Sequence, residues 1–189
     1  MILRMLVLVL ALSSNLTSPL SAACERGSSL IAETGGISSV PGAAGGLQFA
    51  DFFAIMPFDN PLAILAGAPV AFPENGPSNG GIIRVGPASF LLPAIGIYLV
   101  QFQASLLEPA PGSQLELSLT PGGPIANSVA GRATGTTQIV GISLVTTTTP
   151  NTILQVINPS GNTSLTLEQF AGDTTLSPVS AHLVIIRFR

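Results

Sequence analysis

Alternation of apolar and polar residues is the feature that most constrains this chain. It is complete in 114–120 (QLELSLT) and 164–168 (SLTLE), and in 98–104 (YLVQFQA) the even positions are apolar while Gln101 and Gln103 point the other way. Successive side chains of a β-strand point to opposite faces, so each segment is predicted to bury one face. Beyond residue 46 no apolar repeat at helical spacing is sustained, and an all-β fold is therefore expected.

Further short strands are predicted between turn signals. The predicted strands are 49–56, 82–85, 89–92, 125–129, 137–147, 153–157 and 179–188. The turns between strands are rich in Gly, Pro and Asn, as in 75–77 (NGP), 121–124 (PGGP) and 158–161 (NPSG), and these residues favour tight reversals of the chain. About ten strands in roughly 140 residues predict an antiparallel two-sheet sandwich, in particular a jelly roll.

Two of the predicted strands are apolar on both faces. They are 183–186 (LVII) and 139–142 (IVGI), whereas a strand of a two-sheet sandwich needs only one buried face. Because only 8% of the chain is charged, the simplest cover for the second face is another copy of the same chain. A loop of the same chain is the alternative cover.

The charge pattern excludes one class of partner. The chain has no lysine, and its six cationic side chains are arginines spread along the sequence. The formal net charge at pH 7 is -3. Nothing in this pattern would neutralise a row of phosphates, so nucleic-acid binding is not expected.

The first residues have the pattern of an export signal. Arg4 precedes an apolar core at 5–12, and 21–23 (SAA) offers small residues for cleavage. The apolar core is too short to span a bilayer. Residues 1–23 are therefore predicted to be the signal peptide of a secreted chain, and a buried first strand or helix is the alternative.

The residues that follow are predicted to be a linker. Cys24, the only cysteine, comes directly after the predicted cleavage site and is a candidate for lipidation, although Ser21 stands where a lipid-attachment box usually has leucine; an unpaired thiol is the alternative. Several glycines of 24–46 are spaced in multiples of three, but Ser39 interrupts the series that a collagen helix needs. We expect a flexible Gly/Ser/Ala-rich linker at 24–46 and a folded head at 47–189.

Several ordered blocks of the sequence resemble a known family. They are 52–57 (FFAIMP), 70–77 (VAFPENGP), 94–98 (AIGIY), 131–141 (GRATGTTQIVG) and 178–185 (PVSAHLVI). Together they resemble the C-terminal domain of BclA, the collagen-like glycoprotein of the bacillus exosporium. The resemblance implies a jelly roll of the tumour necrosis factor (TNF) and complement globular-head type, trimeric and carried at the tip of surface filaments. Members usually have a long Gly-X-Y stalk before this head, which here has no counterpart beyond the interrupted linker.

Candidate residues for catalysis or metal binding are few. His182 is the only histidine, so a metal cluster or catalytic triad would have just one imidazole, and a hydrogen-bonded strand residue at an interface or the surface is the preferred interpretation. Asp51, Asp59 and Glu74 carry the oxygen ligands that calcium prefers, and some heads of the resembling family bind calcium. Their spacing prescribes no calcium loop, so solvated carboxylates are expected. We predict no catalytic, cofactor or metal site.

The segment 131–136 (GRATGT) lacks the Lys-Ser/Thr ending of a phosphate loop and is predicted to be a turn. Arg132, within this turn, is predicted to pair with a carboxylate of a neighbouring subunit. The residues predicted to form a trimer interface are Arg132, Ile139, Ile142, His182, Val184 and Ile186. Asn162 begins an Asn-x-Ser/Thr pattern and is a candidate glycosylation site.

The sequence thus predicts a secreted or surface-exposed structural protein, not an enzyme, with a trimeric jelly-roll head similar to the exosporium filament tip. The alternative is a trimeric binding module, lectin-like or receptor-directed, because one fold serves both roles. The absence of Trp and the presence of a single Tyr leave few rings for sugars to stack on, which favours the structural role. The expected partners are further copies of the chain, other surface-layer proteins or a glycan, at a cell or spore surface.

Overall fold

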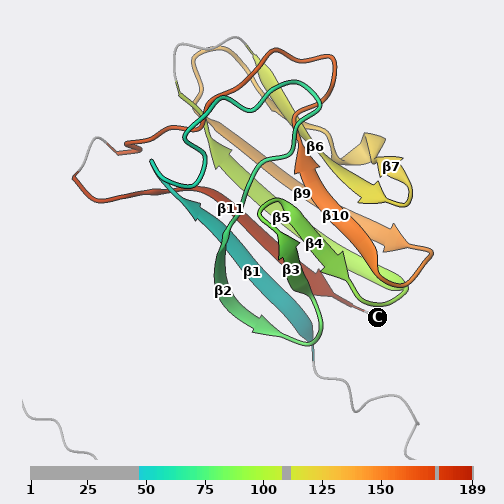
Figure 1. Cartoon of the computed structure of the whole chain (residues 1–189). Coiled ribbons are helices and arrows are strands. Elements are labelled where there is room, and N and C mark those ends of the chain that lie inside the picture. Colours follow the sequence, from blue (N-terminus) through green and yellow to red (C-terminus); the bar gives the residue numbers. More distant parts are fainter. Residues whose placement is uncertain (1–46, 108–111, 173–174, 189) are drawn as a thin grey trace, which may run out of the picture. The chain divides into compact units, whose positions relative to one another are not determined.

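Two antiparallel sheets face each other in the computed structural model, which describes residues 47–107, 112–172 and 175–188 (Figure 1). The five-stranded sheet has the order β2 (Glu74–Asn79), β1 (Gln48–Ile55), β11 (Val179–Arg187), β5 (Gly96–Ser105) and β9 (Gln138–Thr147). The second sheet has the order β3 (Ile83–Gly86), β4 (Ser89–Leu92), β10 (Thr152–Ile157), β6 (Ser113–Thr120) and β7 (Gly123–Pro124), and β8 (Ala130–Arg132) also pairs with β6.

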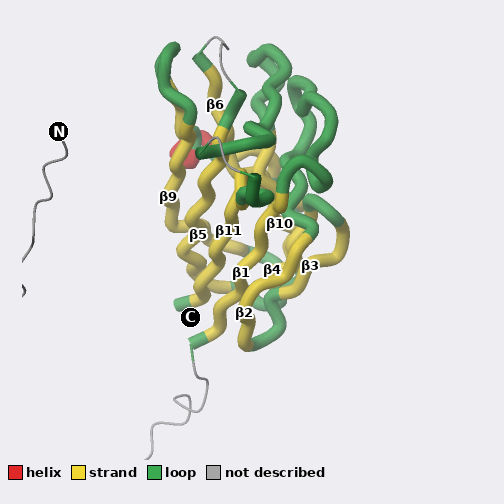
Figure 2. The backbone as a smooth tube through the Cα atoms, turned by 90° about the vertical axis from the view of Figure 1, so that its left-hand side faces the viewer, coloured by secondary structure: helices red, strands yellow, loops and turns green. Residues whose placement is uncertain are grey.

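The strand order confirms the predicted all-β, antiparallel jelly roll. The first described strand, β1, pairs with the last, β11, and the chain changes sheet between β2 and β3, β4 and β5, β5 and β6, β8 and β9, β9 and β10, and β10 and β11. Figure 2 shows β9, β5, β11, β1 and β2 side by side as one layer. Repeated crossing between the sheets distributes neighbouring strands over both layers, as in other jelly rolls.

The predicted signal peptide at 1–23, the linker at 24–46 and Cys24 lie outside the described residues. The described residues belong to one compact unit, Val40–Arg189. Among them there is no helix that is long and apolar enough to cross a membrane. The boundary of the head at residue 47 stays a prediction.

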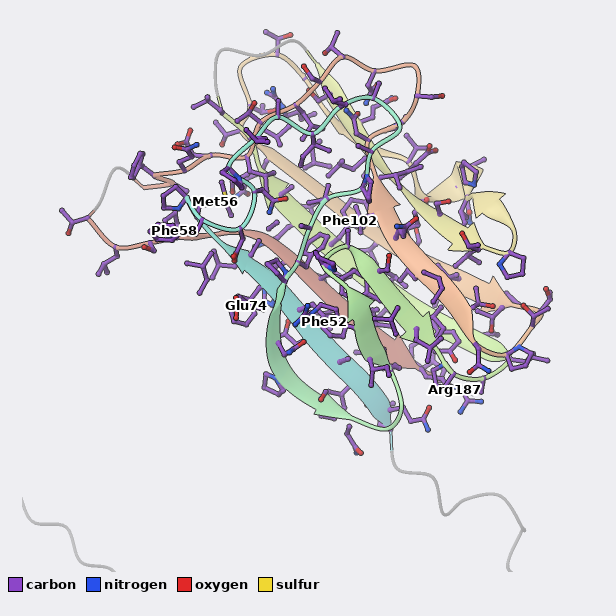
Figure 3. The ribbon with its side chains drawn as sticks, in the orientation of Figure 1. Phe52, Met56, Phe58, Glu74, Phe102 and Arg187 are labelled. Atoms are coloured by element: carbon purple, nitrogen blue, oxygen red, sulfur yellow. The ribbon has the colours of Figure 1, made fainter. Side chains whose placement is uncertain are left out.

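The core lies between the two sheets because alternate residues of each strand point inward. Phe52 of β1 contacts Phe90 of β4 with ring centroids 4.5 Å apart, and Phe72 meets Phe90 edge to face at 6.0 Å. Other large side chains with no more than 1% exposure include Tyr98, Phe102, Leu106, Leu115, Leu117, Leu154 and Leu167, and Figure 3 labels Phe52 and Phe102 among the side chains of the two sheets. Burial of these side chains is the main stabilising contribution to the fold, since the core is apolar and closely packed.

Two segments predicted to be strands have another structure. Residues 125–129 include a 3-10 helix, Ala126–Ser128, because the Ser128 hydroxyl donates to Ile125 O (2.7 Å) and accepts from Leu117 N (2.8 Å), which holds a tight turn in place. Residues 164–168 form isolated bridges through Leu165 and Leu167 and no continuous strand. The predicted alternation is nevertheless present, because both leucines are buried.

Strand β2 was not predicted, since its sequence, ENGPSN, reads as two turns. It is an edge strand that pairs with β1 alone, and its register shifts opposite Asp51. The shift brings Gly76 so close to Asp51 that a Cβ on Gly76 would lie 2.4 Å from the carboxylate oxygen Oδ2. An edge strand with a bulge tolerates Pro77, whose missing N–H is not needed for pairing.

Candidate functional site

The surface of the five-stranded sheet that points away from the second sheet is the main candidate site. Strand register aligns its side chains in three rows across β1, β11, β5 and β9. The rows are Phe53–His182–Gln103–Val140, Asp51–Val184–Gln101–Ile142 and Phe49–Ile186–Leu99–Leu144. We call these residues the outer face. Figure 2 shows the four strands that carry it lying next to one another.

The outer face exposes large apolar side chains along one whole strand. In β9 the exposed fractions are 51% for Val140, 61% for Ile142 and 59% for Leu144. Single exposed apolar residues are ordinary on a protein surface, but a contiguous group of them marks a contact with another molecule. The outer face therefore has the composition of an interface and not of a solvated sheet.

Polar side chains interrupt the outer face near its centre. His182 Nε2 lies 2.5 Å from Asp51 Oδ1, and the two side chains are 36% and 25% exposed. The Phe53 ring meets the imidazole nearly edge on, with centroids 6.3 Å apart. Gln101 and Gln103, with His182 and Val184, line a cavity of about 30 Å³, which is large enough for a water molecule bound by these polar groups.

The structure brings together four of the residues predicted for the trimer interface and leaves two apart. Ile142, His182, Val184 and Ile186 all lie on the outer face. Ile139 instead has no exposed surface and is part of the core. Residues three apart in a strand point to opposite faces, so Ile139 and Ile142 cannot share one face. Val140 lies on the outer face, where Ile139 was expected. The sequence signal for this placement is parity, because the even-numbered residues of 138–146 share one face of β9.

Arg132 is also placed away from the outer face. It belongs to β8, which pairs with β6 in the second sheet, and only 8% of its surface is exposed. Its guanidinium donates to Thr136 O within the same turn. A turn at 134–135, with Gly135 at φ +85°, follows β8 as predicted. This intrachain contact gives Arg132 a role in closing the turn, and the predicted pairing with another subunit is without support from its position.

The structure gives no support to the two candidate modification sites. Asn162 Nδ2, the atom that would carry a glycan, donates to Gln114 O (2.9 Å) and to Asn158 Oδ1 (3.0 Å). Both hydrogens of this amide are therefore engaged, and the side chain is half-buried. Cys24, the candidate for lipidation, lies outside the described residues.

The carboxylates considered for calcium are separate. Asp51 contacts His182, Asp59 Oδ2 accepts a hydrogen bond from Ile55 N at 2.5 Å, and Glu74 lies opposite Phe53 in the β1–β2 pairing. Within the described ranges no three His, Cys, Asp or Glu residues gather as they would around a metal ion.

Comparison with known proteins supports the fold. No protein-family model and no curated protein matches the chain. Among solved structures, the Eiger TNF of S. frugiperda has a TM-score of 0.57 at 12% identity, covering 77% of this chain and 94% of its own. Murine APRIL at pH 5.0 has a TM-score of 0.54 at 12% identity, covering 76% of this chain and 100% of its own.

The chain thus has a TNF-like jelly-roll fold. The globular domain of zebrafish complement 1qA is also similar, with a TM-score of 0.47 at 13% identity. The match covers 76% of this chain and 96% of that domain. At such identities a likeness defines the fold and leaves function open. The resemblance to the exosporium family stays a prediction.

Proposed function

We propose that the chain is a secreted, surface-exposed structural protein whose head, residues 47–189, assembles as a homotrimer through the outer face. The observation that carries this proposal is the row of exposed apolar side chains on β9, with Val140, Ile142 and Leu144 each more than half exposed. Covering these side chains removes apolar area from water, which is the main driving force for association.

A second copy of the chain is the simplest cover. The outer face continues over four strands, so it is wide enough for a subunit and not just for a loop. Its few polar groups, such as Asp51 and His182, already contact each other within one subunit and need no charged partner. Closed symmetry is the usual outcome when a chain covers its own apolar face. The number three comes from the predicted resemblance to the trimeric exosporium head.

A non-enzymatic role agrees with the geometry around the single histidine. The cavity beside His182 has a volume of about 30 Å³, room for a water molecule but far below the roughly 300 Å³ of a small-molecule site. Asp51 and His182 stand on an apolar surface that the proposed assembly would close off. Such a position suits a structural contact and not a site that substrates enter.

Sedimentation velocity on residues 47–189 and on the secreted full-length chain tests the proposal. A trimer at micromolar concentration supports it. A monomer in both samples contradicts it. If the fragment is monomeric and the full-length chain is trimeric, assembly depends on residues before 47, and the outer face is not its main cause.

Recognition of a glycan is a second candidate function, and one further cavity favours it. This cavity, of about 310 Å³, is lined by Ser105, Thr137, Gln138, Glu168, Phe170, Ala171 and Gly172. Phe170 is 58% exposed, so a ring is available for stacking despite the scarcity of Trp and Tyr. A glycan array with the purified chain distinguishes the two functions, because a selective hit supports recognition and silence favours the structural role.

A further inference from the structure

A third cavity, of about 290 Å³, opens between the two sheets at the edge that β2 and β3 form. Figure 1 shows these two strands following each other on the same side of the sandwich. The lining residues are Phe52, Asn75, Gly76, Ser78, Ile82, Ile83 and Arg84. None of them belongs to the outer face, so the cavity is a separate feature and does not depend on the proposed assembly.

The strand register explains why polar groups line this cavity. Asn75 lies opposite Phe52 and Ser78 lies opposite Ala50, and both β1 residues point into the core. Asn75 and Ser78 therefore point to the same side, at the open edge of the sandwich. Phe52 and Ile82 form the floor, and each is only 3% exposed. The accessible part of the cavity therefore combines the polar Asn75 and Ser78 with the exposed side chain of Ile83.

Arg84 is the charged group of the cavity. Its register partner is Phe90, which is fully buried, so the arginine side chain is directed between the sheets. Arg84 Nε lies 3.2 Å from Asn75 Oδ1 and donates to it. Glu74 does not compete, because its partner Phe53 is on the outer face and Glu74 points that way. Within the described ranges the terminal nitrogens of Arg84 have no hydrogen-bond partner.

These observations define a recognition chemistry. A guanidinium whose Nε is already fixed presents its two terminal nitrogens to a carboxylate, which can accept two charge-assisted hydrogen bonds from them. The Ser78 hydroxyl and the Asn75 amide N–H groups are left to bind hydroxyl groups. We propose that this cavity binds a small hydroxylated carboxylate, with the chemistry of a sugar acid.

Addition of a peptide strand at this edge is less compatible with the same residues. Pro77 lacks an N–H, the register of β2 shifts at its neighbour Gly76, and β3 has only four residues. Proline, bulges, short strands and an inward-pointing charge such as Arg84 all discourage pairing of an edge with another chain. A small ligand that uses the side chains fits the edge better than a strand that needs a regular backbone.

Titration of the full-length chain with glucuronate, followed by NMR chemical shifts, tests the proposal. D-Glucose serves as the neutral ring with the same hydroxyl groups, and acetate serves as the carboxylate without them. Glucuronate is expected to perturb residues of β2 and β3 at millimolar concentration, and to bind about 10-fold or more tightly than either control, since a charge-assisted pair and hydroxyl contacts each contribute. Equal binding of glucose or acetate, or no perturbation by glucuronate, contradicts the proposal.

Two variants and one control complete the test. Arg84→Gln is expected to weaken glucuronate binding about 10-fold or more. Asn75→Asp keeps an acceptor for Arg84 but places a negative charge in the cavity, so it is expected to weaken binding as strongly while leaving the fold intact. Val85→Thr changes an exposed residue of β3 that does not line the cavity and is expected to bind as the wild type does.

The outcomes separate this proposal from the proposed assembly. Sedimentation of the same samples reports the oligomeric state, and it is expected to be the same for all three variants. If Arg84→Gln binds glucuronate unchanged and associates further, Arg84 only protects the edge from strand pairing, and the ligand site is wrong. If Asn75→Asp keeps its thermal stability and still binds glucuronate as the wild type does, the proposal is also wrong.

Discussion

The outward surfaces of the two sheets differ in how their apolar and polar side chains are distributed. On the second sheet the outward residues Ile83, Leu91 and Ile153 adjoin one another, but their row ends at Thr120 of β6, and Ile157 pairs with Glu116. On the five-stranded sheet the row Phe49–Ile186–Leu99–Leu144 is apolar across four strands and ends at Asn79 of β2. The five-stranded sheet therefore carries the longer apolar row, and next to it β9 adds three exposed residues, Val140, Ile142 and Leu144, whereas the apolar row of the second sheet is shorter.

The difference teaches that burial of the core does not account for all the apolar residues of this chain. Between the buried Ile139 and Val145 the inward side of β9 carries the small residues Gly141 and Ser143, while the outward side carries Ile142 and Leu144. A strand that served only the core would have the larger side chains inside. The outward side of β9 is therefore more apolar than the core requires, which supports the proposed contact with another copy of the chain.

The largest effect is expected from charge on the outer face. In the variant Ile142→Asp with Leu144→Asp, each subunit would bring two carboxylates into the proposed contact, and burying unpaired charges costs several kcal/mol. We expect the variant to remain folded and to sediment as a monomer at concentrations where the wild type is a trimer. An assembled variant would show that another surface holds the subunits together.

A matched change on the second sheet provides the control. Ile153→Asp introduces one carboxylate, as Ile142→Asp alone would, at an outward position of β10 between Leu91 and Thr120. We expect its oligomeric state to be that of the wild type, because that surface faces water in the proposed assembly. Loss of assembly in Ile153→Asp would remove the distinction between the two outward surfaces.

A smaller effect is expected on the inward side of β9. The Phe102 ring lies against Gly141, and a Cβ at this glycine would be 2.2 Å from the Phe102 ring atom Cζ. Gly141→Ala should therefore overpack the core and lower the free energy of unfolding by about 1–3 kcal/mol. Chemical denaturation measures this loss. A variant as stable as the wild type would mean that the ring moves aside without strain.

Two further variants sharpen the prediction for Gly141. Phe102→Leu removes the ring that an added Cβ would meet. In the Phe102→Leu background, Gly141→Ala should therefore lower the free energy of unfolding by less, and the expected coupling for residues in contact is about 0.5–3 kcal/mol. Gly161→Ala adds the same methyl group where no atom lies within 4 Å, and we expect no loss of stability. Equal losses at Gly141 and Gly161 would contradict steric overlap as the cause.

The sequence predicted most of the fold because alternation and turn residues are local signals. Residues 89–92 were predicted with the bounds that β4 has, and 114–120 correspond to β6 within one residue. The prediction of a strand at 125–129 was wrong. Its apolar residues are typical of a strand, but the Ser128 hydroxyl closes a 3-10 turn. Strand β2 was missed, because its pairing depends on β1 and its own residues favour turns.

The candidate site was predicted less completely. Apolar residues on both faces of 183–186 indicated that a second face would need cover, but which residues share that face depends on parity along each strand. Ile139 was assigned to the wrong side for this reason. The Asp51–His182 contact joins residues 131 positions apart in the sequence, and Arg84 points between the sheets because the pairing of β3 with β4 places it opposite Phe90. No local pattern reports such contacts, and only strand register places them.

The smallest effect is expected at the polar centre of the outer face, where it tests how far the proposed contact extends. Asp51 and His182 are partly exposed in a single subunit, so their coupling in the monomeric Ile142→Asp, Leu144→Asp background should be about 0.2–1 kcal/mol. It is obtained from Asp51→Asn, His182→Gln and the double variant by chemical denaturation. In the assembled wild type, at matched protein concentration, the same pair would be withdrawn from water, and removing one partner would leave the other buried alone. The coupling should therefore be larger in the assembly than in the monomer. Equal couplings would show that water still reaches Asp51 and His182, and that the subunits meet over the apolar rows without closing the centre of the outer face.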